Sequence, residues 1–202
     1  MALADILLDG LPVLDLLEIA PSTSAVAQVV QRDQSSISRI YRQVSRRLGL
    51  NFRKQVNGSY EASANQPLLH GLRLSSQWLR LESSPAEPRW LACGRLELQP
   101  DGVQLHPALP KALVDNCRDH QRLQRLLQKR VLDLLVTTRC TPLSDLPAEL
   151  VEHQLARSSA GVDVMVLRRD LEHQPAIAAL VTAIHRSYRE QALEHPQLEW
   201  QG

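Results

Sequence analysis

Apolar residues recur at helical intervals in the first segment of the chain. Residues 11–19 place Leu14, Leu17 and Ile19 near one side of a helix, and Pro21 follows directly after the segment. Proline lacks a backbone N–H and its ring clashes with the preceding turn, so a helix that reaches this point ends there. The pattern therefore predicts a short first helix over residues 11–19.

A second helix is predicted after the run of hydroxyl side chains at residues 22–24. Hydroxyls at the start of a helix accept hydrogen bonds from its first backbone N–H groups. The apolar residues that follow are spaced to form one face of a short helix. That face consists of Ala25, Val26, Val29 and Val30.

A third, longer helix is predicted between Asp33, which can cap its first turn, and Gly49, which favours the left-handed conformation that ends helices. Its two sides differ in chemistry. We expect the apolar side to be buried and the polar side to be exposed. The apolar side carries Ile37, Ile40, Tyr41, Val44 and Leu48, and the polar side carries Ser35, Ser38, Arg39, Arg42 and Arg46.

A β-hairpin is predicted beyond the third helix. Residues 50–56 and 59–60 flank Asn57-Gly58, a dipeptide that accepts the positive φ angles of a tight hairpin turn. Three helices followed by a hairpin is the plan of a winged helix-turn-helix domain, which we assign to residues 1–65.

The next predicted helix covers residues 66–81, and Pro67 is acceptable in its first turn. It is more apolar than one small domain needs. We therefore expect this helix to dimerise with a second copy of the chain. The residues expected at that contact are Leu68, Leu69, Leu72, Trp78 and Leu79.

Residues 83–88 contain two prolines among polar side chains and predict a linker. Beyond it, short apolar runs alternate with helical patterns, which predicts a small α/β domain with a partly parallel sheet over residues 89–202. The chain as a whole is therefore expected to be α+β, with residues 66–88 as linker helix and hinge. The expected strands are 90–93, 112–117, 131–137, 149–155 and 162–167, and the expected helices are 121–129 and 175–193.

The composition of the 202 residues is that of an ordinary globular protein, 44% hydrophobic and 22% charged. The longest apolar run is shorter than the roughly 18 residues that a membrane helix needs, and the first residues lack the features of a secretory signal. Three cysteines without regular spacing do not suggest a disulfide framework. We expect a cytoplasmic protein that does not bind membranes.

Charge is distributed unevenly, although the formal net charge is only +1. Residues 1–31 carry four acidic side chains and no Lys or Arg, whereas residues 32–54 carry seven basic side chains and one acidic side chain. A local basic excess on a helix with a polar face is the electrostatic footprint of a module that binds nucleic acid.

Motifs in these helices resemble a known family. Residues 25–28 read Ala-Val-Ala-Gln, residues 34–40 read Gln-Ser-Ser-Ile-Ser-Arg-Ile, and Leu48-Gly49 closes the third helix. Their ungapped spacing resembles the helix-turn-helix domain of LysR-type transcriptional regulators, although Asp33 and Ser45 stand where that family has Ser and Glu. The resemblance implies a dimeric, sequence-specific DNA-binding regulator whose third helix is the recognition helix.

Residues 123–135 are similar to a helix and strand of the LysR effector domain, which has the periplasmic-binding-protein fold. That fold has two lobes, and the roughly 110 residues after the linker suffice for about one lobe. The resemblance therefore implies a shortened, single-lobe-like effector domain whose small-molecule sensor is reduced or absent. Control by a small-molecule effector, control by a protein effector, and constitutive DNA binding remain open.

In a helix-turn-helix domain, the exposed face of the recognition helix presents hydrogen-bonding side chains to the major groove. Gln can pair with adenine, Arg with guanine and Ser with several base edges, and Arg39 is the strongest candidate. Hydroxyls and amides at a helix N-terminus suit phosphates, as do basic wing residues. The expected DNA-binding residues are Ser22, Thr23, Ser24, Arg32, Gln34, Ser35, Ser36, Ser38, Arg39, Arg42, Arg53, Lys54 and Asn57.

Each of these residues also has an ordinary structural explanation, since arginines often form a solvated face and serines often cap helices. The leading alternative is a winged-helix module for protein contact or redox sensing, without sequence-specific DNA binding. Affinity for duplex DNA that falls steeply with salt separates the two hypotheses.

Cysteines end or follow three of the expected strands, at the edge where open α/β sheets bind ligands. Cys93, Cys117 and Cys140 could form a redox switch or, with His106 or His120, a metal site. The lack of a Cys-x-x-Cys spacing favours small buried side chains instead. We expect no cofactor and no metal, and no motif in the sequence predicts an enzyme.

Overall fold

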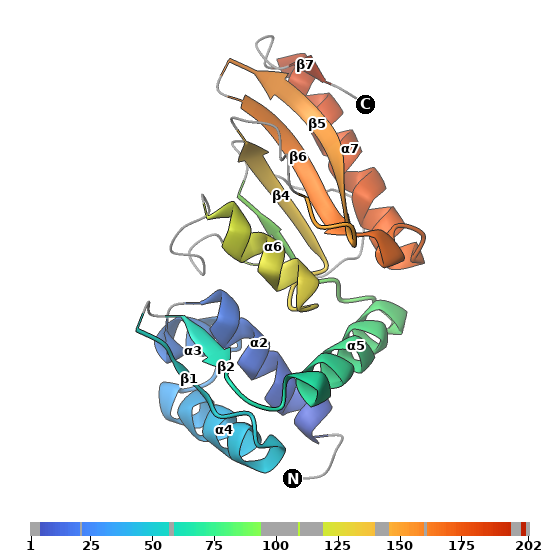
Figure 1. Cartoon of the computed structure of the whole chain (residues 1–202). Coiled ribbons are helices and arrows are strands. Elements are labelled where there is room, and N and C mark those ends of the chain that lie inside the picture. Colours follow the sequence, from blue (N-terminus) through green and yellow to red (C-terminus); the bar gives the residue numbers. More distant parts are fainter. Residues whose placement is uncertain are drawn as a thin grey trace. The chain divides into compact units, whose positions relative to one another are not determined.

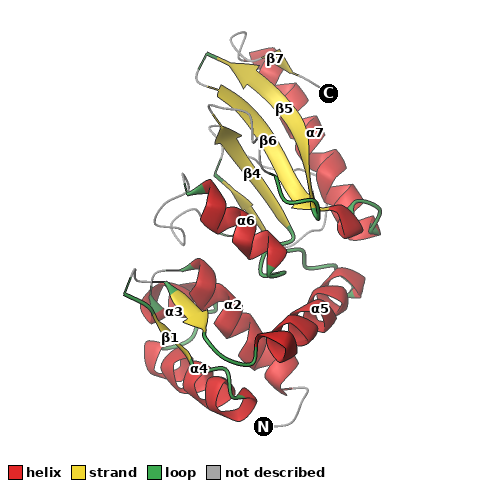
Figure 2. Ribbon diagram, viewed as in Figure 1, coloured by secondary structure: helices red, strands yellow, loops and turns green. Residues whose placement is uncertain are grey.

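The computed structural model describes residues 5–20, 22–56, 59–93, 109, 119–139, 146–159, 161–194 and 199–200. They divide into two compact units. Figure 1 colours the chain by its position in the sequence, and Figure 2 colours it by secondary structure. Unit 1 contains the described chain up to Leu79 together with Lys129–Val131, and unit 2 contains the other described residues from Arg80 onward. Each unit combines helices with strands, so the expected mixture of α and β structure is confirmed.

Unit 1 begins with helices whose ends follow the sequence signals. A π-helix that was not predicted, η1 (Ile6–Gly10), leads directly into α2 (Leu11–Ile19), which has the predicted bounds. The second and third helices, α3 (Thr23–Val29) and α4 (Gln34–Leu48), also begin and end as predicted to within a residue or two. These helices contribute fully buried apolar side chains to the hydrophobic core: Leu11, Leu14, Leu17, Ile19, Val26, Ile37 and Val44.

The predicted hairpin is confirmed by β1 (Phe52–Lys54) and β2 (Tyr60–Ala62), which pair antiparallel with Phe52 opposite Ala62. Asn57 and Gly58, predicted as its turn, lie outside the described residues. The base of the hairpin is attached to α4, because the backbone N–H of Phe52 donates to the hydroxyl of the buried Ser45 at 2.8 Å.

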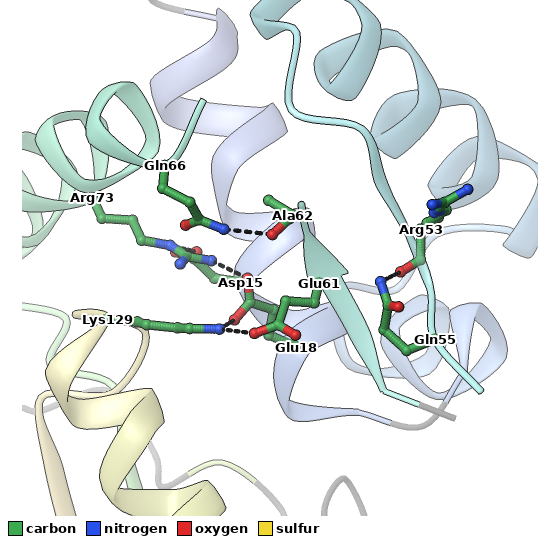
Figure 3. Close-up of polar contacts among 9 residues, drawn as sticks. All are labelled: Asp15, Glu18, Arg53, Gln55, Glu61, Ala62, Gln66, Arg73 and Lys129. Atoms are coloured by element: carbon green, nitrogen blue, oxygen red, sulfur yellow. Dashed lines mark hydrogen bonds and ion pairs between the residues drawn. The ribbon is translucent and has the colours of Figure 1, made fainter. Parts of the chain in front are cut away.

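The helix α5 (Gln66–Glu82) follows the hairpin and bears a buried arginine. Arg73 donates from Nε to Asp15 Oδ1 and from Nη2 to Glu18 Oε1, both at 2.8 Å, and the three side chains are at most 3% exposed. Lys129 Nζ lies 3.3 Å from Glu18 Oε2 and also pairs with Glu61 (Figure 3). We call these five residues the ion network, and it fixes α5 to α2.

Unit 2 contains a sheet with the strand order β3-β4-β6-β5-β7. The strands β3 and β4 are parallel and the other neighbours are antiparallel, which confirms a partly parallel sheet. The expected strand at residues 112–117 lies outside the described residues, and β7 was not predicted. The strand bounds are β3 (Trp90–Ala92), β4 (Leu134–Arg139), β5 (Leu150–Ser158), β6 (Gly161–Arg168) and β7 (Glu199–Trp200).

The strand β4 begins at Leu134, so the predicted start at Val131 is wrong. The fully buried carboxylate of Asp133 explains the difference. It accepts from Arg80 Nη2 at 3.2 Å and from the backbone N–H of Arg89 at 2.7 Å. These bonds fix the residue before the strand, and Val131 is buried without belonging to the sheet.

The helices α6 (His120–Gln128) and α7 (Pro175–Glu194) were predicted, and they lie on opposite faces of the sheet (Figure 1). A short turn of 3-10 helix, η3 (Arg169–Leu171), precedes α7. The core under α7 includes Trp90, Met165 and Tyr188. None of the described helices has the length and apolar character needed to cross a bilayer.

Candidate nucleic-acid interface

The N-terminus of α4 is fixed by Asp33. Its Oδ1 accepts from the Ser35 hydroxyl at 2.5 Å and from the backbone N–H of Ser36 at 2.8 Å, and its Oδ2 accepts from the Ser36 hydroxyl at 2.6 Å. The hydroxyls of Ser35 and Ser36 are the main reason that the pKa of Asp33 is held well below its usual range. The two serines predicted to contact DNA therefore donate to a carboxylate of their own chain, which leaves their oxygens as acceptors.

The C-terminus of α4 is closed just before the hairpin. Gly49 adopts φ +63°, a conformation that side chains with a Cβ disfavour. The backbone N–H of Leu50 then donates to the Ser45 carbonyl at 2.9 Å, and the Asn65 side chain donates to the Leu48 carbonyl at 2.7 Å. These bonds place β1 directly after the helix.

The outer side of α4 is polar and basic along its whole length. Its residues recur at intervals of three and four and line one shallow surface hollow. They are all exposed except Ser38, which is half-buried. We call this set the basic face: Ser35, Ser38, Arg39, Arg42, Gln43, Arg46 and Arg47. Gln43, Arg46 and Arg47 were not among the predicted contacts, although their helical spacing from Arg39 would have indicated them.

The hydroxyl side chains of residues 22–24, at the start of α3, have different structural roles. Ser22 caps the helix by accepting from the backbone N–H of Ala25 at 3.2 Å. Thr23, predicted to bind phosphate, is 7% exposed, and its hydroxyl accepts from Gln34 Nε2 at 3.0 Å. Ser24 is exposed. The Thr23 side chain thus joins α3 to α4 and is turned inward, and its contact with phosphate stays a prediction.

Arg32 lies in the turn between α3 and α4, as the phosphate-binding prediction requires. Its Nη2 pairs with Asp9 Oδ1 of η1 at 3.0 Å, and the two side chains are about half exposed. Surface pairs of this kind contribute little to stability. The guanidinium can therefore exchange Asp9 for another anion at small cost.

The hairpin adds two exposed basic residues, Arg53 and Lys54. Arg53 also accepts through its carbonyl from Gln55 Nε2 at 3.4 Å (Figure 3). Burial raises the pKa of Tyr60 on the neighbouring strand. The predicted contact Asn57 lies outside the described residues.

The residues predicted for dimerisation differ in exposure along α5. Leu68, Trp78 and Leu79 are exposed by 41%, 40% and 54%. Leu72 is half-buried. Leu69 is 1% exposed and belongs to the core of its own chain, and its role in dimerisation stays a prediction.

The cysteine and histidine predictions fall mostly outside the described residues, which include neither Cys117, Cys140 nor His106. Cys93 is half-buried directly after β3, and its backbone N–H donates to the Val136 carbonyl at 2.7 Å. His120 begins α6. Within the ranges that the structure describes, no three metal-ligating side chains come together.

Comparison with known proteins gives matches among solved structures. ArgP from Mycobacterium tuberculosis is 14% identical over 90% of this chain and 97% of its own, with a TM-score of 0.36. LysG from Corynebacterium glutamicum, described as a full-length LTTR with bound effector Arg, is 10% identical over 91% of this chain and 99% of its own, with a TM-score of 0.41. No family model and no curated protein matches the chain.

A third match is described as a LysR family transcriptional regulator, 11% identical over 86% of this chain and 97% of its own, with a TM-score of 0.33. The matched structures thus include one described as a full-length LTTR and one described as a LysR family transcriptional regulator. This is the family that residues 25–49 resemble in sequence. The helix α4 and its basic face occupy the segment that the sequence resemblance assigns to the recognition helix.

Proposed function

We propose that this chain is a cytoplasmic, sequence-specific DNA-binding transcriptional regulator of the LysR type that acts as a homodimer. Residues 1–65 form a winged helix-turn-helix domain, in which α4 enters the major groove and the hairpin is the wing. The observation that carries the proposal is the basic face of α4.

The basic face has the chemistry that duplex DNA requires. Its lining side chains are serine, arginine and glutamine, and they include four arginines but no carboxylate. Arg39 and Arg42, near the middle of the helix, are suited to pair with guanine through two hydrogen bonds. Arg46 and Arg47 lie in the last turn and are suited to phosphates.

The contacts within the chain refine the role of each predicted residue. Ser24, Arg32 and the hairpin cations Arg53 and Lys54 are the proposed phosphate ligands, together with Asn57. Gln34 reads a base only if its amide leaves the Thr23 hydroxyl, to which it donates at 3.0 Å. Recognition is therefore expected to depend more on the arginines of α4 than on its first turn.

The exposed apolar side chains of α5 support self-association. Leu68, Trp78 and Leu79 would be covered by a second copy of the chain, with residues 66–88 as linker helix and hinge. Light scattering is then expected to give twice the chain mass of 22.7 kDa. A monomer at micromolar concentration would contradict the homodimer.

Residues 89–202 form the proposed effector-like domain, a small α/β domain that resembles one lobe of a periplasmic-binding-protein fold. We propose that its small-molecule sensor is reduced or absent. Control by a protein effector, control by a small molecule bound at a reduced site, and constitutive DNA binding are the three alternatives for this domain.

Binding to duplex DNA tests the function directly. Fluorescence anisotropy with a labelled duplex is measured at several salt concentrations, for the wild type and for Arg39→Ala/Arg46→Ala. Counterion release predicts a log–log slope of about −0.9 for each neutralised phosphate, so the variant is expected to bind more weakly and with a shallower slope.

The matched control is Arg186→Ala/Arg189→Ala, which removes the same two positive charges from exposed positions on α7. It is expected to leave the affinity and the salt dependence unchanged. Wild-type protein without salt-dependent DNA binding would contradict the proposal and favour a winged-helix module for protein contact. Equal losses in the control and in the α4 variant would show that binding is not located on the basic face.

A further inference from the structure

Three aromatic rings join α4 to the hairpin. Tyr41 of α4 lies edge-on to Tyr60 of β2, with ring centroids 5.7 Å apart, and 6.3 Å from Phe52 of β1. Phe52 and Tyr60 stack at 6.1 Å. Phe52 and Tyr60 are 4% and 9% exposed, whereas Tyr41 is half-buried at the rim. We call these three residues the aromatic cluster.

Two basic side chains lie against this cluster. The Arg42 guanidinium carbon is 5.8 Å from the centroid of the Tyr41 ring, and Arg42 Nε donates to the Tyr41 hydroxyl at 3.4 Å. The Lys54 ammonium is 6.0 Å from the centroid of the Tyr60 ring. Both separations are within the range of cation–π attraction. The cations come from α4 and from the hairpin, and the same cluster holds both.

Holding a flexible cation in place affects its binding to an anion. Arg and Lys side chains have many rotamers, and ordering them on binding reduces affinity. A side chain that already lies against a ring has fewer conformations to lose. The hydroxyl contact further restricts the Arg42 guanidinium, whose donors form a planar fork. Among the arginines of the basic face, Arg42 is therefore preorganised by a neighbouring ring.

We propose that Tyr41 is a positioning residue for DNA binding, which acts through Arg42, and that the aromatic cluster holds Arg42 and Lys54 in the arrangement that meets the DNA. This inference rests on the proposed function. Tyr41 contributes to affinity only as long as the Arg42 guanidinium is present. A residue that merely packed the helix against the hairpin, or touched DNA itself, would contribute whether or not Arg42 were there.

A double-mutant cycle in the full chain tests this dependence. Anisotropy with the same labelled duplex gives the affinities of the wild type, Tyr41→Leu, Arg42→Ala and the double variant. Tyr41→Leu is expected to weaken wild-type binding roughly two- to fivefold, the size of an exposed cation–π contact. In the Arg42→Ala background the same change is expected to have no further effect. A loss of equal size in both backgrounds would overturn the proposal.

The control cycle pairs Tyr41→Leu with Arg39→Ala, which removes an arginine one turn earlier on the same face. Here the two losses are expected to be additive. If Tyr41 coupled to Arg39 as strongly as to Arg42, its effect would be general and the positioning role would be wrong.

A second variant keeps the cycle informative if Tyr41→Leu does not fold, which thermal unfolding followed by circular dichroism detects. Tyr41→Phe keeps the ring packing and removes the hydroxyl that accepts from Arg42. It is expected to weaken binding less than Tyr41→Leu, and only when Arg42 is present. The proposal would be overturned if Tyr41→Phe did not change the affinity in either background, with Arg42 or with Arg42→Ala. It would also be overturned if Tyr41→Phe caused the same loss in both backgrounds. Wild-type protein that does not bind DNA would instead remove the proposed function together with this inference.

Discussion

Removing the guanidinium of Arg73 is expected to destabilise unit 1 strongly. Its side chain is 2% exposed, and it donates to Asp15 and Glu18, which are 1% and 3% exposed. The variant Arg73→Met preserves most of the side-chain volume but leaves two buried carboxylates without this cation. Breaking a buried ion pair by removing one partner costs about 3–5 kcal/mol.

Urea unfolding at neutral pH measures this change as a shift of the free energy of unfolding. The comparison variant is Arg32→Met, which breaks a pair of similar length, 3.0 Å to Asp9, whose side chains are 47% and 54% exposed. An exposed pair contributes about 0–1 kcal/mol. The two variants thus remove arginine–carboxylate pairs from a buried and from an exposed environment, two pairs in the first case and one in the second.

A third variant separates charge burial from packing. In Arg73→Met/Asp15→Asn/Glu18→Gln the carboxylates are neutral as well, so the triple variant is expected to be more stable than Arg73→Met alone. If Arg73→Met lost no more stability than Arg32→Met, the assumption that burial governs this network would be refuted. A triple variant less stable than Arg73→Met would refute the role of the unpaired charges.

Three further predictions concern the structure around α4 and α7. Gly49→Ala is expected to cost roughly 1–2 kcal/mol in urea unfolding because of the φ of +63°, and Gly49→Asn to cost less; equal costs would contradict this. Ser45→Ala leaves the Phe52 N–H without the hydroxyl that it meets at 2.8 Å, so a loss of about 1–3 kcal/mol is expected and an unchanged urea midpoint would contradict it. Burial of the His185 imidazole, and after it the charge of His153, lowers the pKa of His185 below 6.5 in the folded protein. The neutral imidazole therefore contributes its full stability above pH 6.5, and this stability is lost as the pH falls through the lower folded-state pKa. The free energy of unfolding of the wild type should decrease between about pH 7.5 and 5.5, and that of His185→Gln should decrease less; an equal decrease would contradict the assignment.

The helices of unit 1 were predictable because their ends depend on neighbouring residues. Ser22 and Asp33 accept from N–H groups three residues later, and Gly49 adopts the left-handed conformation after α4. The basic face follows from helical spacing alone. Its last members, Arg46 and Arg47, were not among the predicted contacts because the motif that indicates the recognition helix covers residues 34–40.

Pairings between distant segments were not predictable in the same way. Asp15 and Arg73 are 58 residues apart, and neither has a local pattern that identifies the other. The inward turn of Thr23 depends on the Gln34 amide across the α3–α4 turn. The start of β4 depends on two separate donors to Asp133. In each case the partner comes from elsewhere in the chain, which a single sequence does not show.

The most direct test of base recognition by α4 is a ratio of two affinities. A duplex enriched from a random pool is compared with a scrambled duplex of the same composition, for the wild type and for Arg39→Ala. We expect the wild type to prefer the enriched duplex by about a thousandfold or more. Arg39→Ala should lose about 1–3 kcal/mol of this discrimination while it keeps salt-dependent affinity for both duplexes. An Arg39→Ala protein with the wild-type ratio would contradict the assignment of α4 as the helix that reads the bases.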